Sequence, residues 1–234
     1  MYDEASTCFN KNGELSIGRI NSGVTSGDEK IILAGGQGVA NNESSYLNSI
    51  EIYNIVHKRS EIHTTRMKEK KINSGVCLMS NKRIYIFGGE KNEASSYTEN
   101  QIYYFSSMIE VFHMLPTYYY ECLSLSHQSF IGLVKPLCIE ISANQILLFS
   151  GELHQGNDST AMKSKITYDI GLDNFIYEQE NENCLVPSLP IDSYNAIVLK
   201  SMCIAIPSYI ESVEAPLFTI SLIIKDPLQS ISLS

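Results

Sequence analysis

The chain contains no tryptophan, few charged residues and no long apolar run. Only 18% of its 234 residues are charged, and acidic residues outnumber basic ones by 26 to 17, which gives a net charge of −9. An acidic chain lacks the positive surface that phosphate backbones require, so we expect no nucleic-acid partner. The apolar runs are of strand length, well short of the roughly 18 residues that span a membrane, so we expect no membrane span. A hydrophobic content of 44% is nevertheless typical of a globular protein.

The six cysteines show neither a Cys-x-x-Cys pair nor the spacing of a metal site. We therefore expect free, mostly buried thiols and no bound metal. Residues 1–10 contain no basic segment followed by an apolar one, so the sequence predicts no signal peptide. Free thiols without a secretory signal favour a reducing compartment, and we expect a cytoplasmic protein.

No segment carries a sustained apolar period of 3.6 residues, so the sequence predicts almost no helix. Short runs of β-branched and aromatic residues, such as 30–34 and 83–87, predict strands instead. Each of these two runs ends in a Gly pair, at Gly35-Gly36 and at Gly88-Gly89. Glycine at a strand end permits a positive φ and a close approach of neighbouring backbone.

Three separate sequence matches recur in one order at a period of about 52 residues, which indicates an internal repeat. The matched segments are 20–24 with 72–76, 33–36 with 86–89, and 42–46 with 92–97. Two weaker copies follow, at 148–151 and 204–208. A Tyr-Asp pair or its equivalent lies 15 to 17 residues after each Gly position, at Tyr53-Asn54, Tyr104-Phe105, Tyr168-Asp169 and Lys225-Asp226.

Four short strands per unit, a Gly pair after the second strand and a Tyr-Asp pair after the third resemble Kelch repeats. The tryptophan that usually follows that Tyr by about seven residues is absent, and Phe112 and Phe175 lie near its place. The resemblance covers nearly the whole chain. It implies an all-β fold, a Kelch-like β-propeller of about four four-stranded blades plus a partial blade.

The chain is expected to begin inside a blade, because Phe9 follows Tyr2-Asp3 as Phe175 follows Tyr168-Asp169. The predicted divisions are 1–14 as the end of a preceding blade, blades at 15–66 and 67–115, a degenerate blade with an insertion at 116–180, and a degenerate blade at 181–234. Such a set leaves three alternatives. The chain is part of a longer protein, residues 1–14 meet an incomplete ring, or a partner chain covers the open edges. The first of these is the favoured hypothesis.

The loops between the second and third strands share one face in a propeller, and they are rich here in Asn, Glu, Ser and Tyr. Tyr46 and Tyr97 occupy equivalent positions in two of these loops. Exposed Tyr among adaptable polar neighbours is typical of recognition loops, so we predict that both residues contact a protein partner. The alternative is that each Tyr folds back onto its own blade.

The blade-to-blade segment 115–136 is predicted to be an insertion, because the spacing of the Gly positions there is 151 − 89 = 62 residues. It contains Tyr118, Tyr119 and Tyr120. Three consecutive aromatic residues cannot all be buried by one strand, whose neighbouring side chains point to opposite faces. We therefore predict a partner contact, with a loop that plugs a groove as the alternative.

The run 66–71 is basic within an acidic chain, and Lys71 matches Arg19 in the preceding repeat. Such a run is commonly a solvated turn. Propellers of this type also bind acidic partner segments through basic residues of that face. We therefore include Arg19 and Lys71 among the predicted partner-binding residues.

These observations together predict a non-enzymatic protein-interaction module or a structural subunit of a larger complex, with no cofactor. The alternative is a propeller enzyme that acts on sugars, or a copper oxidoreductase similar to galactose oxidase, which holds its metal through Tyr and His. No His follows the repeated Tyr residues in a matching pattern. His57 and His63 lack a third ligand at a suitable spacing, and Cys122 with His127 lacks an orienting third residue, so no catalytic or metal residue is predicted.

Overall fold

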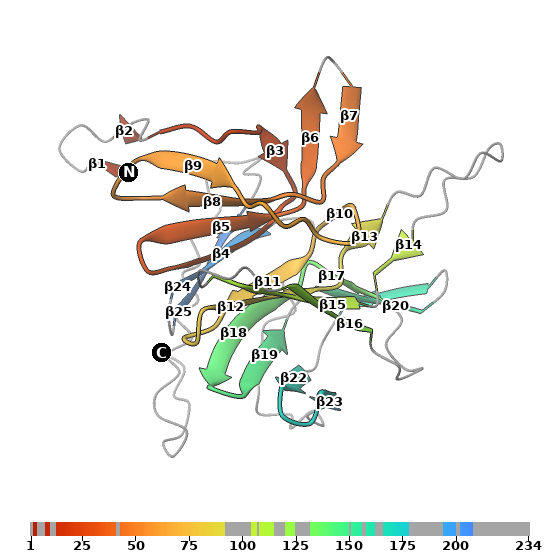
Figure 1. The fold of residues 1–234 in the computed structure, drawn as a ribbon. Coiled ribbons are helices and arrows are strands. Elements are labelled where there is room, and N and C mark those ends of the chain that lie inside the picture. Colours follow the sequence, from red (N-terminus) through yellow and green to blue (C-terminus); the bar gives the residue numbers. More distant parts are fainter. Residues whose placement is uncertain are drawn as a thin grey trace, which may run out of the picture.

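The computed structural model describes residues 2–3, 8–9, 13–40, 43–91, 104–106, 108–114, 120–124, 132–149, 151–155, 158–161, 166–177, 194–199 and 202–207. Their regular elements are all β-strands, as the sequence predicts (Figure 1). Within this part of the chain, no helix has the length and apolarity that crossing a membrane requires.

Three four-stranded antiparallel sheets form the body of the molecule, and in each one the strands follow one another along the chain. The first sheet contains β4 (Gly23–Gly27), β5 (Lys30–Ala34), β8 (Ile50–Asn54) and β9 (Arg59–Ile62). The second contains β11 (Gly75–Leu78), β12 (Arg83–Phe87), β15 (Met108–His113) and β16 (Tyr120–Ser124). The third contains β18 (Leu137–Ser142), β19 (Gln145–Phe149), β22 (Ile166–Asp169) and β23 (Asn174–Tyr177).

Each four-stranded sheet carries a small three-stranded sheet at one end, which the sequence does not predict. These sheets are β3 (Arg19–Ile20) with β6 (Gln37–Ala40) and β7 (Glu43–Tyr46), β10 (Lys71–Ile72) with β13 (Glu90–Lys91) and β14 (Tyr104–Phe105), and β17 (Leu133–Val134) with β20 (Glu152–Gln155) and β21 (Asp158–Ala161). A unit therefore consists of seven strands, and we name β3–β9 unit one, β10–β16 unit two and β17–β23 unit three. The hairpin of β6 and β7 projects from unit one (Figure 1).

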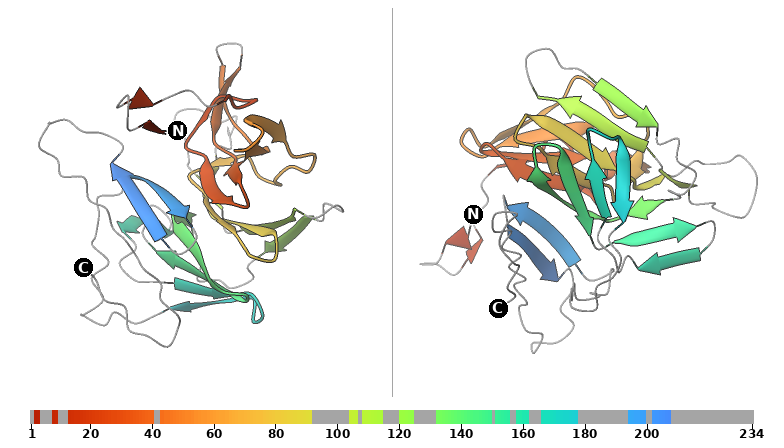
Figure 2. Two further views of the ribbon diagram at one scale, coloured as in Figure 1. Left: turned by 90° about the vertical axis from the view of Figure 1, so that its left-hand side faces the viewer. Right: turned by 90° about the horizontal axis from the view of Figure 1, so that it is seen from below.

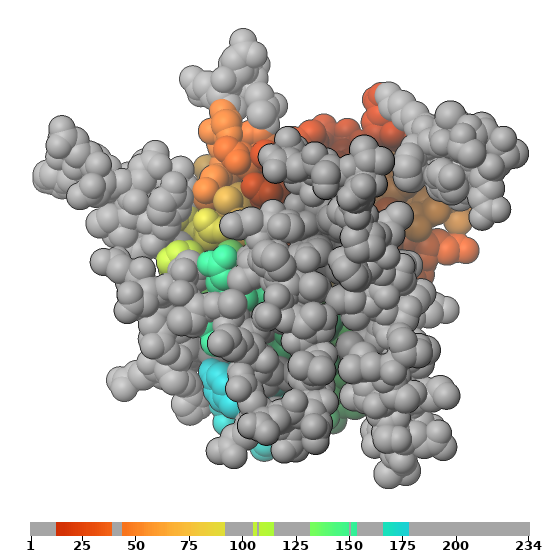
Figure 3. Space-filling model, turned by 180° about the vertical axis from the view of Figure 1, so that it is seen from behind, coloured from red at the N-terminus to blue at the C-terminus, as the bar shows by residue number. Residues whose placement is uncertain are grey.

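The first strands of the four-stranded sheets lie side by side, β4 beside β11 and β11 beside β18. The two-stranded sheet of β24 (Tyr194–Leu199) and β25 (Met202–Pro207) follows, and β24 contacts both β18 and β4. The sheets are thus arranged around a common centre (Figure 2). From behind, described residues of unit one lie above those of unit three (Figure 3).

Backbone hydrogen bonds join the units near that centre. The N–H of Asn73 donates to the carbonyl of Asn21 at 2.8 Å, and the N–H of Lys135 donates to the carbonyl of Asn73 at 2.7 Å. All three residues have a positive φ, of 56°, 56° and 52°. The repeated conformation explains why Asn, which tolerates this region, stands at two of the three positions.

The Gly pairs allow neighbouring units to approach closely, as the sequence predicts. Gly35 and Gly88 have φ values of 63° and 57°. A Cβ atom on Gly35 would overlap the backbone carbonyl of Lys71, and one on Gly88 would overlap that of Leu133. Each of these carbonyls belongs to the next unit, so only glycine fits at these strand ends.

The apolar core lies between the sheets. Ile32 and Ile50 of unit one pack with Ile84 and Phe112 of unit two, and all four side chains are at most 1% exposed. Between units two and three, Tyr85, Phe87 and Tyr168 form a second cluster. Phe175, which lies near the place of the missing tryptophan, is partly buried and packs against this cluster, with 5.1 Å between its ring centroid and that of Tyr168.

The structure differs from the predicted blades in unit two. The Tyr-Asp marker at Tyr104-Phe105 places the third strand of this unit near Tyr104, whereas the third strand is β15 at Met108–His113 and the fourth is β16. The position equivalent to Tyr53-Asn54 is therefore Phe112-His113, which pair with Ile84 and Arg83. The aromatic run at 103–105 was misleading, because it has strand composition but contributes only the short β14.

The extra length of this region also lies elsewhere than predicted. Counted between equivalent residues, the linker from Cys122 to Leu137 is only two residues longer than the linker from Ile62 to Gly75 (137 − 122 = 15 and 75 − 62 = 13). The connection from Gly89 to Ile109 is longer than that from Gly36 to Ile50 (109 − 89 = 20 and 50 − 36 = 14). The segment 115–136 is therefore not an inserted loop, since β16 and β17 lie within it.

The ends of the chain contribute two smaller sheets. β1 (Tyr2–Asp3) pairs with β2 (Cys8–Phe9), and Tyr2 is opposite Phe9 exactly as Tyr168 is opposite Phe175. β24 and β25 form the other. The described residues thus contain three complete four-stranded sheets and two partial ones, and they do not show a closed propeller.

Candidate functional site

Arg19 is buried in an ion pair inside unit one. Its guanidinium lies 2.7 Å from Oε2 of Glu51, and neither side chain has any exposed surface. The same guanidinium donates hydrogen bonds to the carbonyl oxygen of Gly35 at 2.9 Å and to that of Ser49 at 3.3 Å. Burial lowers the pKa of Arg19, while the charge and hydrogen bond of Glu51 act in the opposite direction. Arg19 therefore connects β3, and with it the three-stranded sheet, to the beginning of β8.

Lys71 repeats this arrangement in unit two. Its Nζ lies 3.0 Å from Oε1 of Glu110, and both side chains are again fully buried. The second oxygen of Glu110 accepts a hydrogen bond of 2.7 Å from the N–H of Lys68, three residues before the cation. Glu51 likewise accepts the N–H of Ser16, three residues before Arg19. We call each set a charge clamp: a third-strand carboxylate that binds a cation and a backbone N–H of the preceding linker.

Unit three lacks both charges at once. Leu133 occupies the position of Arg19 and Lys71 in β17. Ile166 occupies that of Glu51 and Glu110 in β22, because Leu148, its partner in β19, corresponds to Leu33 and Ile86. Both Leu133 and Ile166 are 0% exposed. The paired loss is expected physically, because a lone buried charge costs far more than a buried apolar side chain.

The structure therefore differs from the prediction that Arg19 and Lys71 present their charges to a partner. Each cation is buried against a carboxylate of its own chain, so neither side chain is available at the surface of this conformation. The sequence signal that identified the pair, their equivalence in the repeat, was correct. The partners Glu51 and Glu110 were missed, because their contact with the cations depends on strand pairing.

A half-buried polar cluster extends the second clamp. Glu69 pairs with Lys91 at 2.9 Å and accepts a hydrogen bond from the hydroxyl of Ser106. Burial alone would raise the pKa of Glu69, but these hydrogen bonds and the charges of Lys71 and Lys91 outweigh it and hold the pKa below its usual value. The cluster joins the linker between units one and two, through Glu69, to β13 and to the segment between β14 and β15.

The predicted tyrosine contacts fall on very different parts of the structure. Tyr46 ends β7 opposite Gln37 and is half-buried. Tyr120 begins β16 opposite Phe112, so it belongs to a blade strand. Tyr97, Tyr118 and Tyr119 lie outside the described residues. The prediction that these five residues bind a partner stays a prediction.

The two histidines considered as metal ligands, His57 and His63, lie in different environments. His57 is exposed in the β8–β9 turn, whereas His63 is 5% exposed, bonds to the carbonyl of Thr65 and packs edge-on against Phe112. Among the described residues, no group of three or more His, Cys, Asp or Glu side chains is placed to hold a metal ion. The His127 prediction lies outside the described part, and for Cys122 only the backbone of β16 is described.

Two of the cysteines, Cys77 and Cys138, are free and buried, as predicted. Burial, with a smaller contribution from Glu140, raises the pKa of Cys77 to about 12. Burial also raises the pKa of Cys138. Both thiols therefore stay protonated at neutral pH, which suits a role in the core.

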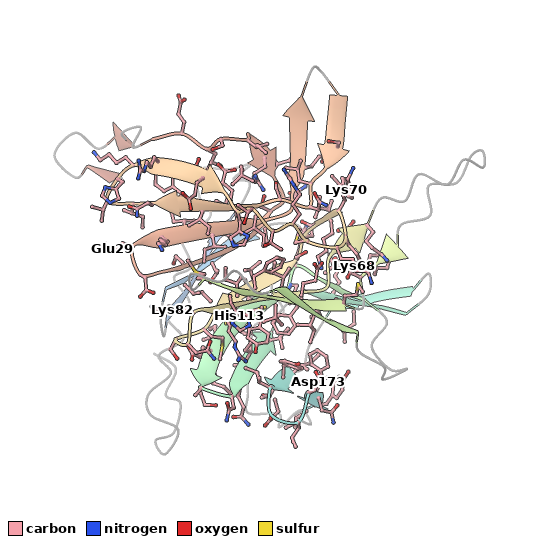
Figure 4. The ribbon with its side chains drawn as sticks, in the orientation of Figure 1. Glu29, Lys68, Lys70, Lys82, His113 and Asp173 are labelled. Carbon is pink, nitrogen blue, oxygen red and sulfur yellow. The ribbon has the colours of Figure 1, made fainter. Side chains whose placement is uncertain are left out.

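The opposite end of unit one carries a groove that the sequence did not reveal. It has a volume of about 430 Å³. Its lining residues come from β5, β8, β9, the β8–β9 turn and the position after β15 in unit two: Lys30, Ile52, Asn54, His57, Arg59, Ser60, Glu61 and Met114. The β4–β5 turn lies at this end, as does Lys82, whereas Lys68 and Lys70 lie at the other end (Figure 4).

The comparisons with known proteins identify one feature of this architecture. The Kelch motif matches residues 18–61, which run from the start of β3 nearly to the end of β9. The resemblance predicted from the repeated Gly pair is thus confirmed in unit one. No curated protein matches the chain.

Proposed function

We propose that this Kelch-motif chain is a non-enzymatic protein-interaction module that contacts its partner through the three-stranded sheets at the Gly-pair ends of the units. Kelch repeats commonly mediate protein interactions, which gives the general class. The observation that carries the proposal is that each unit extends its strand-two-to-strand-three connection into a small sheet beyond its four-stranded body. The β6–β7 hairpin stands out from the body as such a connection (Figure 1).

The charge clamps support this assignment because they fix the small sheets to rigid bodies. Arg19 and Lys71 each begin the first strand of a three-stranded sheet and bind the third strand of the adjacent four-stranded one. A recognition surface gains affinity when its loops are ordered before binding, since less conformational entropy is lost. Tyr46, half-buried at the end of β7, is the proposed contact residue that the structure describes on this hairpin.

We further propose that the units form a propeller in which β24 completes the circle of first strands. The contacts of β24 with both β18 and β4 support this arrangement. In such a ring, the three small sheets share one face, so a single partner could contact more than one of them.

Affinity capture tests the interaction proposal. The full chain and its Tyr46→Ser, Tyr97→Ser double variant are used as baits, and proteins that bind the parent specifically are identified by mass spectrometry. A Val56→Ser variant is the control, because Val56 is 56% exposed in the turn at the opposite end of unit one. We expect the tyrosine variant to lose a partner that the control retains, with both variants melting near the parent temperature.

Two results would contradict the proposal. Equal capture of partners by the parent and the tyrosine variant would show that the β6–β7 hairpin does not take part in the interaction. Copper bound stoichiometrically to the purified protein would favour the oxidoreductase alternative over an interaction module.

A further inference from the structure

We propose that the groove at the turn end of unit one, lined by Lys30, Asn54 and Arg59, binds an acidic peptide segment of a partner protein. The groove is distinct from the Gly-pair end, because β5 and β8 run between the two ends of the sheet. This inference rests on the proposed function, since it assigns a second contact surface to the same interaction module. The occupant is identified by the charge and shape of the lining.

Three polar side chains form a row across the sheet. Lys30 of β5 is the cross-strand partner of Asn54 in β8, and Asn54 is the partner of Arg59 in β9. Directly opposed residues of antiparallel strands have Cβ atoms roughly 5 Å apart and project from the same face. The sheet thus presents two fixed cations with an amide between them, a spacing that suits a chain carrying more than one carboxylate.

Both cations are available for binding. In the part of the chain that the structure describes, the ion pairs engage Arg19, Lys71, Lys82 and Lys91, and no ion pair involves Lys30 or Arg59. Two unpaired cations at one groove create a local positive potential that attracts an anionic segment.

The floor of the groove is apolar. Ile52, 8% exposed, precedes Asn54 by two residues on the same face of β8, and Met114 reaches the groove from the end of β15. A groove between two units with an aliphatic floor and a cationic wall fits a peptide that alternates acidic and aliphatic side chains. A free inorganic anion would use the cations but leave the floor uncovered.

One carboxylate lies among the lining residues and sharpens the test. Glu61 is the cross-strand partner of Ile52 and lies two residues from Arg59 on the same strand. A like charge at this distance weakens the binding of an acidic segment. Removing the charge of Glu61 should therefore strengthen binding, whereas loss of Lys30 and Arg59 should weaken it.

The experiment measures the binding of a fluorescein-labelled Glu-Leu-Asp-Leu-Glu peptide to the full chain by fluorescence anisotropy at low salt. The matched probe is the amide peptide Gln-Leu-Asn-Leu-Gln. The protein variants are Lys30→Gln with Arg59→Gln, and Glu61→Gln. The control is Lys68→Gln with Lys70→Gln, which changes the net charge equally at two exposed residues of the opposite end (Figure 4).

The acidic peptide should bind the parent at least tenfold more tightly than the amide peptide. The Lys30→Gln, Arg59→Gln variant should lose about tenfold in affinity, and Glu61→Gln should gain a few-fold. The Lys68→Gln, Lys70→Gln control should bind as the parent does. Inorganic phosphate should displace the peptide only through the general effect of ionic strength.

Several results would overturn the inference. They are equal binding of the two peptides, an equal loss in the control variant, no binding of the acidic peptide up to millimolar protein, or specific displacement by low phosphate. The Tyr46→Ser variant separates this inference from the proposed function, because it changes the other end of the unit. If it loses the captured partner while the acidic peptide fails to bind the parent, the interaction module stands and the groove assignment falls.

Discussion

The cation at the start of each small sheet shows how closely residue identity follows the repeat. Arg19 and Lys71 are matched by position, and each binds a third-strand glutamate that is matched as well. Unit three replaces the cation by Leu133 and the carboxylate by Ile166, and both side chains are buried. The two positions have therefore changed together within one chain, as expected if their mutual contact, rather than either charge alone, is what matters for stability.

Replacing the second clamp by the residues of unit three should cost less than breaking it. Lys71→Met alone leaves Glu110 buried without its cation, so we expect a loss of about 3–5 kcal/mol in the free energy of unfolding. The double variant Lys71→Leu, Glu110→Ile removes both charges and should lose less than the single variant. Urea denaturation of the full chain measures both changes. A double variant less stable than Lys71→Met would show that the two positions do not act as a pair.

The lowered pKa of Glu69 predicts a pH-dependent stability. A carboxylate whose pKa is depressed on folding stabilises the protein above its unfolded pKa and loses that contribution as the pH falls through the folded value. Glu69→Gln should therefore melt below the parent at pH 7, and the gap should narrow progressively below about pH 5. Ser106→Ala, which removes one donor, should show the same trend. Thermal melts from pH 7 to pH 4 test this, and a constant gap would contradict the assigned role.

Residue chemistry was predictable from the sequence only where it depends on local pattern. The equivalence of Lys71 with Arg19 follows from counting, and the positive φ and close approach at the Gly pairs follow from residue type at a strand end. The glutamates and the groove row of Lys30, Asn54 and Arg59 do not, because these contacts join strands whose pairing register must first be known. In the basic run 66–71, Arg66, Lys68 and Lys70 are exposed, as in a solvated turn, whereas Lys71 is buried in an ion pair.

At the scale of elements, the sequence predicts which segments are strands, but only partly predicts which place each strand takes in its sheet. β5 and β12 coincide with the predicted runs at 30–34 and 83–87. In unit two, however, the aromatic segment near Tyr104 predicts the third strand, whereas β15 is that strand. Amino-acid composition identifies a segment as a strand but not its place in the sheet. The six additional residues between Gly89 and Ile109 move the third strand further along the sequence, and the composition of the segment does not reveal this.

The Gly pairs are the elements on which the contact between units depends most directly. We expect Gly88→Ala to destabilise the chain by more than about 2 kcal/mol, because the new Cβ would overlap the carbonyl of Leu133 and the φ of 57° is unfavourable for alanine. Gly18→Ala is the matched control, since nothing lies within 4 Å of a Cβ at that position. Denaturant titration of both variants tests this, and equal effects would show that the close approach is not required.

At the scale of the whole molecule, the repeat predicted an all-β fold, and the described sheets agree. The three-stranded sheets could not be predicted, because strands such as β3 and β10 have two residues each and carry no periodicity. The sequence also left three alternatives for the open edges. Among the described residues, β24 contacts both β18 and β4, so it lies beside the first strands of units one and three.

That arrangement makes a prediction about the behaviour of the isolated chain. If β24 covers the first strands of units one and three, the chain of residues 1–234 should be a monomer that melts in one cooperative transition. If those edges are open, neighbouring copies should pair through them and aggregate. Size-exclusion chromatography with light scattering gives the mass, and calorimetry gives the cooperativity. A shortened chain that ends at Tyr177 is the comparison, because it lacks β24 and should associate and melt at a lower temperature. If the chain of residues 1–234 associates as readily as the shortened one, β24 does not cover the edges. The first strands β4 and β18 are then open to contact with further blades or a partner chain.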